Sequence, residues 1–153
     1  MEKFLENLEK AENTLYALNH LTYVTLNVVK DKKILLKILS ETKDVVAICV
    51  NSILQYEYLL KRINLYQNHE RNLLTFEKKC AQRYGITEDE IAEIKELLVI
   101  MRVYKNSHME LIKNDRLAII SESAQKSVPI EKIKDYLALA RKIFSKTKEQ
   151  ILR

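Results

Sequence analysis

The sequence predicts an all-α protein built as an up-and-down bundle of about five helices. The chain of 153 residues contains one glycine and one proline, the two residues that most often mark turns and interrupt helices. Apolar residues also recur at spacings of three and four along most of the chain. The length suits one core, so we expect residues 1–153 to form a single helical-bundle domain.

The first two predicted helices lie on either side of a basic cluster. Phe4, Leu8 and Leu15 belong to one apolar stripe, which predicts a helix over about residues 2–29. Residues 30–33, Lys-Asp-Lys-Lys, mark the turn that follows. A second stripe predicts a long helix over about residues 32–63, with a possible break near residues 40–42, where Thr42 interrupts the apolar positions.

The third and fourth predicted helices meet at the single glycine. A short stripe beginning at Leu73 stops at Gly85, a natural residue to follow a helix C-terminus. Thr87 and Glu90 then predict a capping box that opens the fourth helix. Ile91 and Met101 belong to the apolar stripe of that helix, whose end is hard to place.

The segment from residue 106 to 128 lacks helical periodicity. Residues 116–121 are a short extended candidate followed by a serine-rich turn, and an isolated strand would need a partner from a loop or another subunit. Pro129 suits the first turn of a last helix, which carries an apolar stripe from Ile130 to Ile151.

The composition excludes several kinds of site. One glycine cannot form a glycine-rich nucleotide-binding loop, and the two cysteines are not at the spacing of a zinc site or disulfide framework. Three histidines show neither HExxH nor Glu-x-x-His spacing. We therefore expect no cofactor and no metal.

The charge and the N-terminus suggest a partner and a location. The net charge of +5 favours an anionic partner such as RNA, although a lysine-rich, solvated surface would give the same value. The first residues are acidic rather than basic, and the longest apolar run, residues 45–50, is far too short to span a bilayer. We expect a cytoplasmic protein with no membrane partner.

Arg102 and His108 are the pair of residues that could carry chemistry. Neutral His108 could take a proton from a ribose 2′-hydroxyl while Arg102 stabilises charge that builds on the phosphate. On a straight helix the two side chains would face different directions, so this chemistry requires the helix to end or bend between them. Alternatively, His108 is a partly buried residue that closes the fourth stripe, and Arg102 is a solvent-facing cation near the helix C-terminus.

The Arg-x5-His motif at the end of a long helix, before the final helix of a bundle, resembles the HEPN superfamily. Many members of that family are metal-independent ribonucleases that act as dimers with their motifs facing each other, and others are inert. The resemblance implies that Arg102 stabilises the phosphate, that His108 is the base and that Asn106 is a polar support. The chain departs from many members in having Val103, an apolar residue, directly after the arginine.

Basic and aromatic residues near this motif predict an RNA-binding face. Lysine and arginine side chains can bind phosphates, and Tyr104 can stack on an unpaired base. The alternative is a non-enzymatic helical module that joins the protein to itself or to another helical protein. The expected RNA-binding residues are Tyr104, Lys105, Asn106, Lys113 and Arg116, in a protein expected to be a homodimer.

Overall fold

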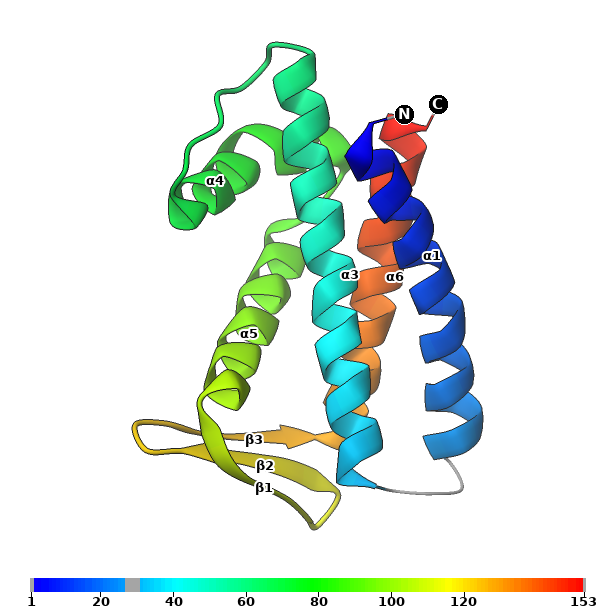
Figure 1. The fold of residues 1–153 in the computed structure, drawn as a ribbon, viewed down its shortest axis with the longest axis vertical. Helices are drawn as coiled ribbons and strands as arrows, with labels where there is room; N and C mark the ends of the chain where they lie inside the picture. Colours follow the sequence, from blue (N-terminus) through cyan, green and yellow to red (C-terminus); the bar gives the residue numbers. More distant parts are fainter. Residues whose placement is uncertain (1, 27–30, 153) are drawn as a thin grey trace.

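Four long helices lie side by side, and a small sheet crosses one end of them (Figure 1). The computed structural model describes residues 2–26 and 31–152, and the described chain begins and ends away from the sheet. The α-helices are α1 (Lys3–His20), α3 (Lys32–Leu59), α4 (His69–Thr75), α5 (Glu88–Lys105) and α6 (Ile130–Ile151). The π-helices are η1 (Leu21–Thr25) and η2 (Phe76–Cys80), the 3-10 helix is η3 (Ala81–Tyr84), and the strands are β1 (Ser107–Lys113), β2 (Arg116–Ser121) and β3 (Gln125–Pro129).

The first helix follows its predicted stripe and then widens into a π turn. The predicted residues Phe4, Leu8 and Leu15 are all buried on α1. In η1 the wider turn keeps Thr22 in the core while Tyr23 and Val24 are exposed. Helical structure is described as far as residue 26, and the rest of the predicted helix, residues 27–29, lies outside the described residues, as does Lys30.

The second helix, α3, is uninterrupted. The Asp31 side chain accepts a hydrogen bond from the Lys33 backbone N–H at 2.8 Å, so Lys32 and Lys33 begin the helix instead of forming a turn. Its 28 residues extend about 42 Å. The predicted break near residues 40–42 is wrong, because Thr42 is fully buried and its methyl group can pack like an apolar side chain.

The end of α3 comes at Leu59, earlier than the predicted residue 63. Lys61 adopts a left-handed conformation with φ of 60°. The Arg62 N–H donates to the Glu57 carbonyl at 3.0 Å and the Lys61 N–H to the Tyr58 carbonyl at 2.9 Å. This pair of bonds is the Schellman closure, which satisfies the last carbonyl groups and stops the helix.

The third predicted helix and its boundary with the fourth are confirmed. Helical turns run through α4, η2 and η3 and stop at Gly85, whose φ of 72° is the left-handed conformation that glycine adopts without strain. Both capping-box bonds form: the Glu90 N–H donates to Thr87 Oγ1 at 3.1 Å, and the Thr87 N–H donates to Glu90 Oε1 at 2.9 Å.

The sheet is an antiparallel meander in the order β1-β2-β3. The predicted extended segment 116–121 is β2, and its partners are strands of the same chain rather than a loop or another subunit. Asn114 and Asp115, with φ of 53° and 58°, form the two-residue turn between β1 and β2. Leu117 and Ile119 are completely buried, so one face of β2 closes the helical core.

The chain is mostly helical, as predicted, but the small sheet means that it is not purely α. The sequence does not reveal the whole sheet, because the apolar residues of β1 do not alternate regularly with polar ones and β3 is short and mostly polar. The core lies among the long helices, where α3 packs against both α1 and α6. Pro129 is the last residue of β3 and directly precedes α6, so it does not stand in the first turn of that helix as predicted.

Candidate functional site

Arg102 and His108 lie on different elements at the sheet end of the bundle. Arg102 is exposed in the last turn of α5, and His108 is exposed on β1. The helix ends between them, as the proposed chemistry requires, and the Asn106 side-chain amide donates to the Arg102 carbonyl at 3.2 Å. Within residues 2–26 and 31–152, neither the guanidinium nor the imidazole makes a hydrogen bond or an ion pair.

His108 borders an open pocket of about 490 Å³ beside the turn between β2 and β3. The pocket brings His108 together with Asn106 and the serine-rich turn, including Ser123, but Arg102 is not among the residues that line it. Glu122 also lines it and would repel a phosphate. The alternative prediction, in which His108 is a partly buried residue that closes the fourth helical stripe, is wrong, because the residue belongs to a strand and is exposed.

Tyr104 lies in a second groove, of about 420 Å³, between the start of α3, the end of α5 and β1. The tyrosine is partly buried and packs against the core. Three lysines from the first two turns of α3 line the same groove, at the end of the molecule where β1 passes beneath α3 (Figure 1). They are Lys32, Lys33 and Lys37.

Two carboxylates reduce the positive charge of this groove. The Lys37 ammonium lies 3.6 Å from a Glu41 carboxylate oxygen. The Glu110 carboxylate accepts a hydrogen bond from Ser107, and its backbone carbonyl accepts one from Lys32 Nζ at 3.1 Å. Three ammonium groups against two carboxylates leave a small positive excess.

The other predicted RNA-binding residues do not gather around Tyr104 in the same way. Lys105 is the last residue of α5 and Lys113 the last of β1, and both are exposed. Arg116 is held on the sheet, where its Nε donates to Ser127 Oγ at 2.7 Å and its Nη2 donates to the Ser127 carbonyl at 3.0 Å. Asn106 caps the end of α5.

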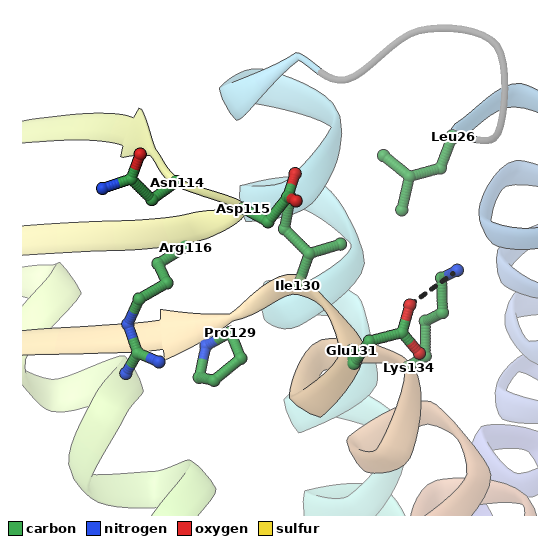
Figure 2. Close-up of a pocket in the computed structure, with 8 residues that line it drawn as sticks. All are labelled: Leu26, Asn114, Asp115, Arg116, Pro129, Ile130, Glu131 and Lys134. Carbon is green, nitrogen blue, oxygen red and sulfur yellow. Dashed lines mark hydrogen bonds and ion pairs between the residues drawn. The ribbon is translucent and has the colours of Figure 1, made fainter.

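Arg116 also lines a pocket of about 450 Å³ between the β1–β2 turn and the start of α6 (Figure 2). Lys134 there donates a 3.4 Å hydrogen bond to Glu131, and the Arg116 side chain extends along the sheet away from that pair. Asp115 adds a second carboxylate. Opposite charges are mixed in this pocket, so it favours no anionic ligand.

Sequence reasoning missed a buried carboxylate at the far end of α3. Glu57 is completely buried, forms ion pairs with Arg62, at 3.1 Å, and with Arg83, and accepts a hydrogen bond from the Tyr84 hydroxyl at 3.2 Å. Burial, with smaller contributions from Cys80 and Tyr56, raises the pKa of Tyr84 to about 12, so its hydroxyl stays protonated and can donate. A glutamate four residues after Ile53, on the predicted apolar stripe, is the signal that could have revealed it.

Sequence reasoning also missed the lysines of α3 as site residues. Their adjacent positions resemble a turn in the sequence, and nothing local links them to Tyr104, which is 67 positions beyond Lys37.

No group of three or more His, Cys, Asp or Glu side chains in the described part of the chain is arranged to hold a metal ion. No helix in the described part of the chain, residues 2–26 and 31–152, is long and apolar enough to cross a bilayer.

Comparisons with models of protein families, with curated proteins and with solved structures find no match to this chain. The resemblance to HEPN proteins therefore stays a prediction that rests on the helical order and on Arg102 and His108.

Proposed function

We propose that the protein binds single-stranded RNA in the groove between α3, α5 and β1, and that it does so without cleaving it. The observation that carries the proposal is that three lysines of α3 line the same groove as Tyr104. Lysines neutralise phosphates, and an aromatic ring supplies a stacking surface that accepts any base. The groove has a volume of about 420 Å³, which leaves room for part of a flexible strand.

The lysine contribution can be tested by the salt dependence of binding. Lys33→Gln with Lys37→Gln removes two cations from the groove. The expected result is weaker binding of a labelled single-stranded RNA and a fall of roughly 1.4 in the slope of log affinity against log salt, about 0.7 for each phosphate that is no longer neutralised. Fluorescence anisotropy over a range of salt concentrations measures both quantities.

The matched control for this variant is Lys78→Gln with Lys79→Gln. Those two lysines are exposed on η2, which lies away from the sheet end of the bundle, and the change in net charge is the same (Figure 1). The control should bind like the native chain. Equal losses in the two variants would mean that binding follows overall charge, and the groove would then be rejected.

Tyr104 tests the stacking contribution. Tyr104→Leu should weaken binding at least about fivefold, because a base–aromatic stack is worth about 1–3 kcal/mol. Tyr104→Phe keeps the ring and should bind normally. Native-like helical circular dichroism must be shown for both variants, since Tyr104 also packs against the core.

The same RNA set, incubated with EDTA, separates binding from catalysis. We expect the RNA to stay intact, because Arg102 does not line the pocket that His108 borders, and no hydrogen bond joins the two side chains in the described residues. Cleavage by the native chain that disappears in both Arg102→Ala and His108→Ala would overturn the proposed lack of activity and support a HEPN-type ribonuclease.

A further inference from the structure

The first helix, α1, lies on one side of the bundle (Figure 1), and α1 and η1 carry exposed aromatic side chains. Tyr16 is 73% exposed, Tyr23 is 43% exposed and the neighbouring Val24 is 53% exposed. Tyr23 and Val24 belong to η1, and π turns next to α-helices occur frequently at functional sites. An exposed group of large apolar side chains marks an interaction surface.

A cleft lies beside Tyr16, between α1 and α6. Its volume is about 240 Å³, roughly that of eight water molecules, which is enough for one aromatic side chain. Leu15 and Phe144 form an apolar floor, and both are almost completely buried. Asn19 also lines the cleft, and its buried Oδ1 has no hydrogen-bond partner among the described residues. The cleft can therefore accept a group that is apolar along its body and carries a donor.

A cation and an anion on this side of the bundle, Arg141 and Glu9, form no ion pair with the described residues. Arg141 borders the cleft and holds its guanidinium 5.7 Å from the centre of the Tyr23 ring, but it pairs with no carboxylate among the described residues. Glu9 is exposed on α1 and makes no ion pair with another described residue. Lys148, by contrast, is already paired with Glu12 at 2.9 Å.

We propose that a second copy of the chain docks on this surface, with its α1 antiparallel to the first, so that Tyr16 of each copy enters the cleft of the other. The tyrosine is apolar along its ring and its hydroxyl is a donor, as the cleft requires. In an antiparallel pair centred on Tyr16, Glu9 lies opposite Tyr23 and the Arg141 that rests on its ring. Two-fold symmetry makes this ion pair twice.

The surface suits a second copy because the projecting side chain, the cleft and both charges belong to one face. A two-fold interface needs a patch that is complementary to itself. Together α1 and η1 have 23 described residues, so the two helices could run beside each other for about 34 Å. The proposed RNA groove uses none of these residues, and α5 with Arg102 lies on the other side of the bundle (Figure 1).

Sedimentation equilibrium over a wide range of protein concentrations tests the docking residue. The native chain should dimerise, and Tyr16→Glu should raise the dimer dissociation constant at least about tenfold, as expected for a central aromatic anchor. Tyr58→Glu is the matched control, because Tyr58 is also an exposed helical tyrosine, at the far end of α3. The dimer dissociation constant of Tyr58→Glu should equal that of the native chain, and so should that of Arg102→Ala.

Charge reversal tests the antiparallel arrangement. Glu9→Lys and Arg141→Glu should each raise the dissociation constant severalfold, and the two substitutions in one chain should restore the native value because the pair is only inverted. Thermal unfolding followed by circular dichroism shows that each variant is folded. A native chain that stays monomeric at every concentration, or a dimer insensitive to Tyr16→Glu, would overturn the proposal, and failure of the double reversal would overturn the antiparallel pairing.

Discussion

Glu57 illustrates how one buried charge can organise a surface region. Its carboxylate joins the end of α3 to η3 through Arg62, Arg83 and Tyr84. Both arginine side chains are nearly half exposed, at 46% and 45%, so they satisfy the carboxylate without losing all contact with water. Removing the cations would leave a charge in the core, which is far more costly than losing a surface ion pair.

The double substitution Arg62→Met and Arg83→Met tests this residue. The free energy of unfolding should fall by about 3–5 kcal/mol because the Glu57 carboxylate keeps no cationic partner, and each single substitution should cost less because the other arginine remains. Urea unfolding measures the change. Arg71→Met is the control, since that arginine stacks on Tyr66 at the surface and should cost about 1 kcal/mol or less. A double variant as stable as this control would contradict the prediction.

Two helix ends use the same closure with different residues in the left-handed position. After η3 the Ile86 N–H donates to the Ala81 carbonyl at 3.0 Å, and Gly85 occupies the left-handed position. After α3 the same place is taken by Lys61, which has a Cβ that crowds the following carbonyl. The chain thus forms one helix end with glycine and the other at a cost in backbone strain.

Lys61→Gly should raise the free energy of unfolding by roughly 0.5–1 kcal/mol, because glycine adopts positive φ without the Cβ penalty. Lys61→Ala separates the backbone effect from loss of the lysine side chain. This variant should show no increase in the free energy of unfolding. Thermal and urea unfolding of the three proteins measure the difference. Equal stability of the alanine and glycine variants would show that the side chain, not the backbone conformation, decides the effect.

The whole molecule is held by one core that includes both cysteines. Cys49 on α3 and Cys80 in η2 are completely buried and free. Burial raises the pKa of the Cys49 thiol to about 12 and that of Cys80 to about 11, although Thr147 and Lys79, respectively, lower these values slightly. Both thiols therefore stay protonated, and their reaction reports opening of the fold.

Alkylation at pH 8 should be more than about a hundredfold slower in the native protein than in urea, because the thiolate is the reactive species. The variants Cys49→Ala and Cys80→Ala isolate each thiol. Cys80 should react faster than Cys49, since η2 is a short element that can open locally whereas α3 is central to the core. Equal native rates for the two thiols would instead indicate that only global unfolding exposes them.

The candidate site is only partly predictable from the sequence. The spacing of Arg102 and His108 identifies that pair, and the helix does end between them. The sequence predicts Tyr104 as a stacking residue, but the basic neighbours that it predicts lie further along the chain. Packing of α3 beside α5 and β1 instead supplies Lys32, Lys33 and Lys37. A spacing rule cannot detect such a group, because the residues that form it are distant in the sequence.

The sequence by itself determined the long helices, the stop at Gly85, the capping box at Thr87 and the extended segment 116–121. Each of these depends on residues within about one helical turn or a few strand positions, so local spacing is enough to predict it. Only the tertiary structure decided the partners of that strand, the uninterrupted path of α3 through Thr42 and the groove around Tyr104. Those features depend on which surfaces pack together, and packing joins residues that no local pattern connects.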